Sequence, residues 1–147
     1  MKYYAYNDFK NDVNTLISMV AEFEAEAIVA IARGGLTLSH ALAEGLNIRD
    51  VQSIRTEFYD IQIKRDEIAI FGSCNFKEVK RVLVVDDISD SGETLSVVMG
   101  CLKSEFKNIE FKSATLFYKE TSKYEPDFWI NIADDWIDFF WERDFMR

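Results

Sequence analysis

The sequence predicts an α/β fold in which a mostly parallel, twisted sheet is flanked by helices. Short, continuous apolar runs at 27–32 and 82–85 are typical of strands that are buried on both faces. Segments with helical spacing of apolar residues alternate with these runs, as expected when crossover helices connect parallel strands. The chain length of 147 residues fits one ordinary domain, so we expect a single domain over 1–147.

The first third of the chain predicts a helix, a strand and a second helix. Asn7 or Asp8 is expected to cap the first helix. Its apolar residues recur at spacings of three and four, which predicts one buried face: Phe9, Val13, Leu16, Ile17, Val20 and Phe23. The run at 27–32 predicts the first buried strand, and residues 36–46 predict the next helix.

The remainder of the chain predicts further strands around one more helix. Strands are expected at 51–59, 68–71, 82–85 and 113–118. Residues 93–106 have helical spacing, and the polar, charged stretch 60–67 predicts a mobile loop. Residues 128–132 precede a terminal aromatic segment at 136–141.

The composition excludes several classes of function. A formal net charge of -9 argues against a broad electrostatic surface for nucleic acid or for an anionic membrane. No apolar stretch is long enough to span a bilayer and the start lacks the layout of a signal peptide, so we expect a cytoplasmic protein without an integral membrane segment. Cys74 and Cys101 lack CxxC spacing and a nearby histidine, so neither a zinc site nor a redox pair is expected.

The strongest candidate for chemistry follows the strand at 82–85. Asp86 and Asp87 end this strand, and desolvated carboxylates need hydroxyl, amide or metal partners. Shortly afterwards a glycine, two hydroxyls and successive backbone N–H groups open a helix, over the residues Asp90, Ser91, Gly92, Glu93 and Thr94. Such a loop suits a phosphate. The acid pair and the loop together predict a site for a ribose 5-phosphate.

A second polar loop, Arg33-Gly34-Gly35, follows the strand at 27–32. Because ligands gather at the carboxyl ends of parallel strands, we expect this loop and residues 86–94 at one edge of the sheet, although they lie about fifty residues apart. Other nucleotide motifs are absent, since the sequence contains neither GxxxxGK[ST] nor GxGxxG after a strand. A phosphoacceptor receiver domain also has an acid pair at a strand end, but the hydroxyl and glycine loop fits that class poorly.

Two segments resemble motifs of the type I phosphoribosyltransferases. Residues 82–94 combine a hydrophobic strand, an acid pair and an Asp-Ser-Gly-Glu-Thr loop, and look like the signature with which that family binds phosphoribosyl pyrophosphate. Residues 30–36 look like its pyrophosphate loop, and the order and separation of the two motifs agree. The resemblance implies the type I phosphoribosyltransferase fold with a small hood formed by the C-terminal segment.

Within this family, the chain most resembles the small bacterial xanthine-guanine phosphoribosyltransferases, and the resemblance covers residues 28–142. Residues 59–60, followed by Arg65, are similar to their flexible catalytic loop. Lys119 is similar to their purine-contacting lysine, and residues 135–138 to their base-stacking segment. The resemblance also implies a homodimer or homotetramer.

The resemblance implies a role for residues of every segment. Substrate contacts are expected from Arg33, Gly34, Arg65, Asp86, Asp87, Ile88, Ser89, Asp90, Ser91, Gly92, Glu93, Thr94, Lys119, Trp136 and Ile137. Asp86 and Asp87 would hold the ribose hydroxyls, Asp87 through Mg²⁺, the expected cofactor. Asp90 is the expected catalytic base, accepting the N7 proton of a purine as N9 attacks the anomeric carbon. A strained or cis peptide is expected between Ala32 and Arg33.

These assignments have structural alternatives. The acid pair could merely cap a strand end, and Arg33-Gly34 could form a plain turn. Asp90 also suits the N-cap of the following helix, while Arg65 and Lys119 suit a solvated surface. Trp136 has the spacing of a core aromatic residue.

Three functions follow from these readings. The main hypothesis is transfer of phosphoribosyl from phosphoribosyl pyrophosphate to a 6-oxopurine, because Lys119 as a donor suits a 6-oxo group and not the 6-amino group of adenine. The second is a regulatory relative that senses phosphoribosyl pyrophosphate and binds RNA or DNA, which the acidic composition disfavours. The third is transfer to another acceptor, such as a pyrimidine, which the Lys119 and Trp136 segments disfavour.

Overall fold

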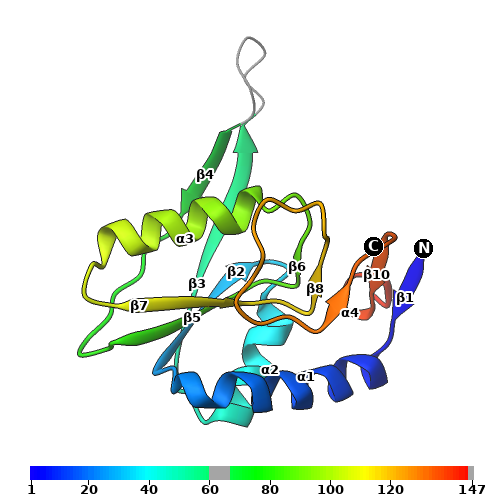
Figure 1. Cartoon of the computed structure of the whole chain (residues 1–147), viewed down its shortest axis with the longest axis horizontal. Helices are drawn as coiled ribbons and strands as arrows, with labels where there is room; N and C mark the ends of the chain where they lie inside the picture. The colour runs from blue at the N-terminus through cyan, green and yellow to red at the C-terminus, as the bar shows by residue number, and fades with distance from the viewer. Residues whose placement is uncertain (60–66, 146–147) are drawn as a thin grey trace.

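The computed structural model describes residues 1–59 and 67–145. At its centre lies a five-stranded sheet with the strand order β4-β3-β2-β5-β7 (Figure 1). Its strands are β2 (Ala27–Ala32), β3 (Asp50–Tyr59), β4 (Glu67–Phe71), β5 (Arg81–Val85) and β7 (Glu110–Ala114). All neighbours pair in parallel except β3 and β4, which form an antiparallel hairpin. The predicted α/β fold with a mostly parallel sheet is confirmed.

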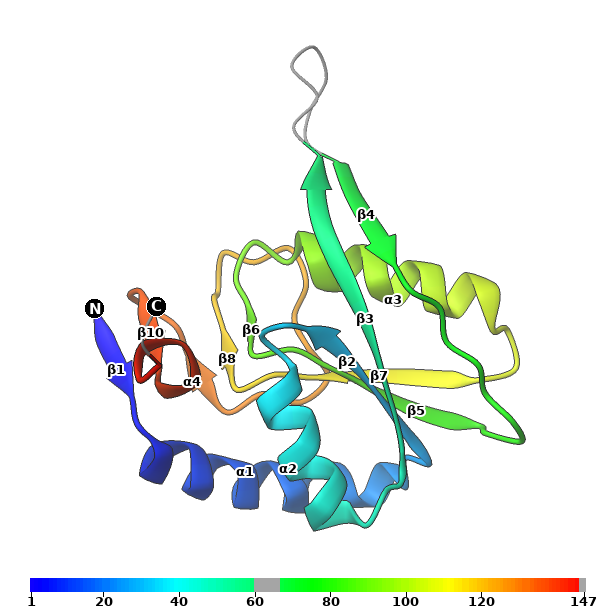
Figure 2. The same cartoon turned by 180° about the vertical axis from the view of Figure 1, so that it is seen from behind.

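Helices cover both faces of this sheet, as predicted. They are α1 (Tyr6–Val20), the short 3-10 helix η1 (Ala21–Phe23), α2 (Leu36–Leu46) and α3 (Glu93–Glu105). α1 and α2 pack on one face and α3 on the other (Figure 2). Successive strand residues serve opposite faces: Ile28 and Leu83 pack toward α1 and α2, whereas Val29 and Val84 pack toward α3. Burial on both faces is the reason why these strands are apolar throughout.

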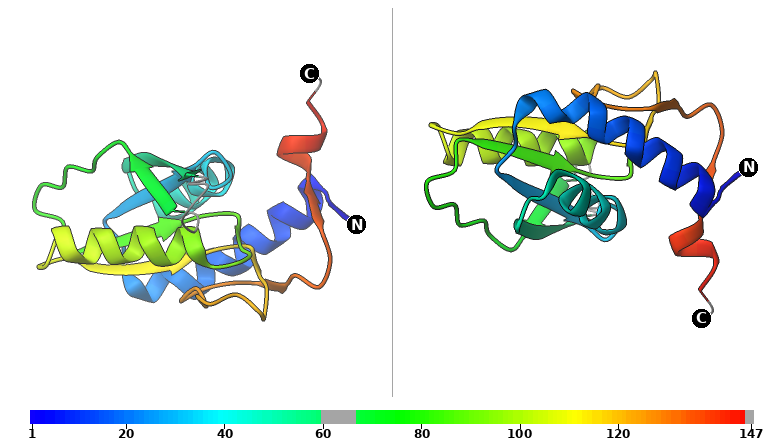
Figure 3. Two further views of the ribbon diagram at one scale, coloured as in Figure 1. Left: turned by 90° about the horizontal axis from the view of Figure 1, so that it is seen from above. Right: turned by 90° about the horizontal axis from the view of Figure 1, so that it is seen from below.

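The two ends of the chain form a small hood beside the main sheet (Figure 3). The hood consists of β1 (Lys2–Tyr4), β10 (Ile137–Phe139) and the single-turn helix α4 (Phe140–Arg143). β1 and β10 pair in parallel, and the buried Tyr4 ring meets the rings of Phe117, Phe139 and Trp141 edge-on. The predicted C-terminal hood is therefore confirmed, with an N-terminal strand added to it.

A third, three-stranded parallel sheet connects the main sheet with the hood. Its strands are β6 (Ile88–Ser89), β8 (Phe117–Tyr118) and β9 (Asn131–Ile132). The strand predicted at 113–118 is therefore wrong as one element, because β7 ends at Ala114 and β8 belongs to another sheet. The chain changes sheets where the backbone N–H groups of Thr115 and Leu116 donate to the carbonyls of Phe128 and Asp87.

The start of α1 differs from the prediction. The helix begins at Tyr6, with Ala5 in the N-cap position, so neither Asn7 nor Asp8 is the N-cap. Asp8 lies in the first turn instead, where its carboxylate accepts a hydrogen bond from the Ala5 backbone N–H at 3.2 Å. The carboxylate thus satisfies a backbone donor near the helix start from inside the helix.

The loop predicted at 60–67 falls almost wholly outside the described residues, and Glu67 is the first residue of β4. Across residues 1–59 and 67–145, the helices are all too short or too polar to cross a membrane.

Gly35 lies where the start of α2 approaches the sheet most closely. A Cβ added there would meet the carbonyl oxygens of Val85 and of Ile31, the latter at 2.9 Å, whereas a Cβ at Gly100 of α3 would meet nothing within 4 Å. We expect Gly35→Ala to lower the free energy of unfolding by about 1–3 kcal/mol. Gly100→Ala should raise it by about 0.5–1 kcal/mol. Urea denaturation measures both free energies. If Gly35→Ala leaves the free energy of unfolding unchanged, the start of α2 does not approach the sheet as closely as described.

Candidate active site

The loops after β2 and β5 meet at the carboxyl edge of the main sheet, as predicted. A Cβ added at Gly34 would lie 2.5 Å from Oδ2 of Asp87, so the two segments are in direct contact. Gly34 therefore has no room for a side chain, and its backbone is free to approach a ligand. The peptide bond between Ala32 and Arg33 is cis, which matches the strained or cis peptide that the resemblance implied.

The two acids at the end of β5 have the most strongly shifted pKa values at this edge of the sheet. Asp87 is 8% exposed, and its backbone N–H donates to Oδ1 of Asp86 at 2.8 Å. Burial raises the pKa of Asp86 well above its usual range, and the adjacent charge of Asp87 raises it further. Burial also raises the pKa of Asp87 to about 6, with Glu142 adding to the increase and a hydrogen bond with Asp86 opposing it. Two neighbouring carboxylates in this state need a cation or hydroxyl donors when they are charged.

The loop between β5 and α3 encloses a cavity of about 350 Å³, which we call the loop cavity. It is lined by Phe58, Asp86, Asp87, Ile88, Ser89, Asp90, Ser91, Gly92, Thr94 and Leu95. Gly92 is the N-cap of α3 with a φ of 86°, and the Ser91 hydroxyl accepts a hydrogen bond from the Glu93 N–H at 3.2 Å. A helix start with a glycine turn is suited to an anion such as phosphate.

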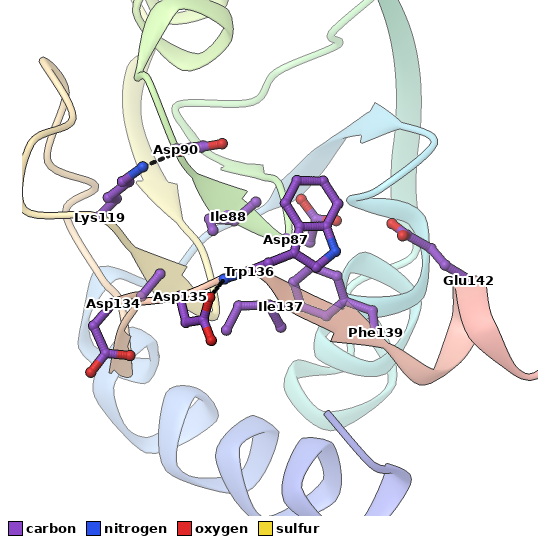
Figure 4. A pocket seen from close by; sticks show the side chains of 11 residues that line it. Asp87, Ile88, Asp90, Lys119, Asp134, Asp135, Trp136, Ile137, Phe139 and Glu142 are labelled. Carbon is purple, nitrogen blue, oxygen red and sulfur yellow. Dashed lines mark hydrogen bonds and ion pairs between the residues drawn. The ribbon is translucent and has the colours of Figure 1, made fainter. Parts of the chain in front are cut away.

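A second cavity of about 380 Å³, the hood cavity, lies between this loop and the hood (Figure 4). It is lined by Asp87, Ile88, Asp90, Lys119, Ala133, Asp134, Asp135, Trp136, Ile137, Phe139 and Glu142. Lys119 Nζ lies 3.6 Å from Oδ1 of Asp90, so the two charged side chains face each other at one wall. Trp136 is 66% exposed, which leaves its ring surface free to stack on a planar ligand.

A third cavity of about 460 Å³, the turn cavity, opens at the turn after β2. Its lining residues are Arg33, Gly34, Leu36, Thr37, Trp141, Glu142 and Phe145. Asp87 lines both the loop and hood cavities, and Glu142 lines both the hood and turn cavities. The three cavities therefore form one composite site with the acid pair at its centre.

All the predicted site residues that the structure describes line this composite site, except Glu93. The Glu93 carboxylate pairs with Lys123 Nζ at 2.7 Å instead. Arg65 lies outside the described residues. The N-cap alternative for Asp90 is wrong because Gly92 is the N-cap, and the core alternative for Trp136 is wrong because the side chain is exposed.

Sequence reasoning missed several lining residues, among them Phe58 and Glu142. Phe58 follows the buried Ile54 by four residues along β3, so the alternation of a strand places both on the α3 face. That period is visible in the sequence, but only the position of α3 shows that Phe58 reaches the loop cavity. Glu142 carries no local signal, because only the packing of the hood brings α4 to the site.

The acid pair fits a hard cation such as Mg²⁺. Within the described parts of the chain, no three His, Cys, Asp or Glu side chains gather into a complete metal site. Mg²⁺ typically keeps several waters and takes one or two carboxylates together with substrate phosphates. The buried carboxylates of Asp86 and Asp87 suit such a partial set of ligands, since their charged forms lack full compensation.

A larger cavity, about 660 Å³, lies elsewhere, between α2 and β3. None of the predicted site residues lines it. The acid pair, the loop and the hood therefore remain the candidate active site.

A covered parallel sheet with a glycine and hydroxyl loop at its carboxyl edge is typical of the class of proteins that bind phosphorylated nucleotides or sugars there. The chain belongs to the phosphoribosyltransferase family, because the phosphoribosyl transferase domain matches residues 3–144. The resemblance to the type I phosphoribosyltransferases in the sequence is thereby confirmed.

Known relatives agree with this family. The xanthine-guanine phosphoribosyltransferase of Idiomarina loihiensis is 30% identical over 120 residues, which cover 80% of this chain and 71% of the relative. The structure of the Helicobacter pylori xanthine-guanine-hypoxanthine phosphoribosyltransferase superposes with a TM-score of 0.91 and 36% identity, covering 97% of this chain and 94% of that one. A purine phosphoribosyltransferase from Pyrococcus horikoshii superposes with a TM-score of 0.85 and 29% identity, covering 95% and 92%.

The raised pKa of Asp87 makes the stability of the free protein depend on pH. Because the folded chain holds this proton more tightly than the unfolded chain, the free energy of unfolding should rise as the pH falls through about 6 toward the ordinary value of 3.8. Asp87→Asn removes the cost of the buried charge. The variant should therefore be more stable than the wild type at neutral pH in EDTA, and the difference should shrink on acidification.

Denaturant titrations at neutral and acidic pH measure this difference. Glu120→Gln is the matched control, since Glu120 is an exposed acid outside the site. Equal free energies of unfolding for the wild type and Asp87→Asn at both pH values would contradict the claim that the buried Asp87 charge destabilises the folded protein.

Proposed function

We propose that this protein transfers the 5-phosphoribosyl group of phosphoribosyl pyrophosphate to N9 of a 6-oxopurine and releases pyrophosphate. The observation that supports this most strongly is the composite site, in which an anion-binding loop, an exposed aromatic cavity and a glycine turn meet at Asp87. The names of the Idiomarina and Helicobacter relatives add guanine, xanthine and hypoxanthine as candidate bases. Such a reaction would serve purine salvage.

The ribose phosphate would occupy the loop cavity and the pyrophosphate the turn cavity. Backbone N–H groups and hydroxyls at 90–94 suit the 5-phosphate, and the acid pair suits the ribose hydroxyls. The backbone of Arg33 and Gly34 with the Arg33 side chain suits the pyrophosphate, whose charge grows as it leaves. We also propose that Arg65 closes over this end of the site.

The base would occupy the hood cavity. Trp136 would stack on the purine ring, and Ile137 would offer backbone groups to its 2-substituent. Lys119 would donate a hydrogen bond to the 6-oxo group, which selects against adenine because its 6-amino group is itself a donor.

The chemical step breaks the bond between the anomeric carbon and the pyrophosphate oxygen and forms a bond from that carbon to N9. Asp90 accepts the proton that the base loses at N7, and Lys119, 3.6 Å away, keeps the Asp90 carboxylate oriented toward the hood cavity. Arg33 and the neighbouring N–H groups take up the charge of the leaving pyrophosphate. The hood shields the reacting atoms from water.

We propose that Mg²⁺ is the cofactor and that Asp87, with Asp86, holds it beside the ribose hydroxyls. When bound, the ion would neutralise the pyrophosphate and the buried carboxylates. A homodimer or homotetramer in the cytoplasm stays a prediction.

A regulatory relative that binds RNA or DNA is the alternative, and the net charge of -9 disfavours it. The deciding experiment incubates the protein with Mg²⁺, phosphoribosyl pyrophosphate and, separately, guanine, xanthine, hypoxanthine or adenine. Nucleotide formation is followed by absorbance. Product from the 6-oxopurines and little from adenine is expected. Absence of product from every base, despite binding of phosphoribosyl pyrophosphate, would favour the regulatory alternative.

Asp90→Asn tests the base assignment. Because an amide cannot accept the N7 proton, turnover should fall by about a hundred- to ten-thousandfold, while the affinity for ribose 5-phosphate stays near that of the wild type. Steady-state kinetics and calorimetry measure the two effects. Glu110→Gln, the same acid-to-amide change at an exposed position at the start of β7, is the control and should leave turnover unchanged. Normal turnover in Asp90→Asn would show that another group accepts the proton.

A further inference from the structure

The turn from Lys119 to Tyr124 packs directly against the loop between β5 and α3. The backbone N–H of Lys119 donates to the carbonyl of Ser89 at 3.1 Å, and that of Lys123 donates to the carbonyl of Ser91 at 3.0 Å. Lys119 lines the hood cavity, whereas Ser89 and Ser91 line the loop cavity. The turn therefore joins the walls of two cavities that the proposed reaction fills with different parts of its substrates.

A buried hydroxyl network fixes this junction. Ser89 is 2% exposed, and its hydroxyl donates to the carbonyl of Tyr124 at 2.7 Å. The Ser122 hydroxyl lies 2.9 Å from Oγ of Ser89 and can also donate to the carbonyl of Tyr124 at 3.1 Å, so both hydroxyls converge on that carbonyl. Ser122 Oγ also accepts the N–H of Tyr124 at 3.2 Å. Ser122 thus connects the turn to the one buried hydroxyl of the loop.

The loop and the turn pack tightly against each other at Gly92. A Cβ added at Gly92 would lie 2.5 Å from Oγ of Ser122 and 2.6 Å from the backbone nitrogen of Tyr124. On the outside of the junction, Lys123 Nζ pairs with Glu93 Oε1 at 2.7 Å. A movement of the loop is therefore transmitted to the turn that carries Lys119.

We propose that the Lys119–Tyr124 turn couples purine binding to ribose phosphate binding, with Ser122 as the positioning residue. A phosphate that orders Ser91 and Gly92 holds Ser122 in place, and Ser122 holds the turn from which Lys119 reaches the base. Coupling between two sites is reciprocal, so each ligand tightens the binding of the other by the same factor. This inference rests on the proposed function and extends it to a residue outside both family motifs.

Calorimetry with ribose 5-phosphate and hypoxanthine tests the coupling without turnover, because this pair lacks the pyrophosphate leaving group. Each ligand is titrated into the protein alone and into the protein saturated with the other. In the wild type each should tighten the other by about five- to 150-fold, the range usual for coupled sites. In Ser122→Ala this factor should fall toward one, and Ser122→Thr, which keeps the hydroxyl, should restore it.

Ser104→Ala, an exposed serine in α3, is the matched control and should keep the wild-type factor. If Ser122→Ala fails to fold, Lys123→Met loosens the same junction from outside and should lower the factor. An unchanged factor in these variants, or independent binding of the two ligands in the wild type, would overturn the inference. If neither ligand binds the wild type, the proposed function itself fails.

Discussion

The buried acid pair at the end of β5 is the constraint on which the rest of the site depends. Asp86 and Asp87 leave a strand that is covered on both faces, so their charges are separated from water and their pKa values rise. A chain that needed only stability would place apolar or amide side chains there. Two carboxylates are tolerable at this position if a cation and ribose hydroxyls compensate their charges. The proposed reaction takes place in that ligand-bound state.

The topology arranges the other groups around this pair. Parallel pairing of β2 with β5 brings the glycine turn against Asp87, and the start of α3 presents the phosphate loop on its other side. The hood then adds Trp136 and Ile137, held by the pairing of β1 with β10. Segments from the first third, the middle and the C-terminal part of the chain thus converge around one carboxylate.

Much of this was predictable from the sequence because it is local. A strand buried on both faces is a continuous apolar run, which can be recognised in the sequence. The acids, hydroxyl residues and glycine of the loop at 86–94 indicate a phosphate site without knowledge of the rest of the fold. The hood strand β1 was not predictable, since three residues paired with a partner far along the chain leave no periodic signal. The division between β7 and β8 depends on distant carbonyl acceptors, and Glu142 reaches the site only through the packing of the hood.

The most direct test is thermal unfolding in EDTA, with Mg²⁺ alone, with phosphoribosyl pyrophosphate alone, and with both together. If the acid pair is completed by a cation and the ribose hydroxyls, the combination should raise the melting temperature more than the sum of the two single additions, because a ligand that binds only the folded state stabilises it by mass action. The Asp86→Asn, Asp87→Asn double variant should lose this excess. No excess in the wild type, or the same excess in the double variant, would contradict the account.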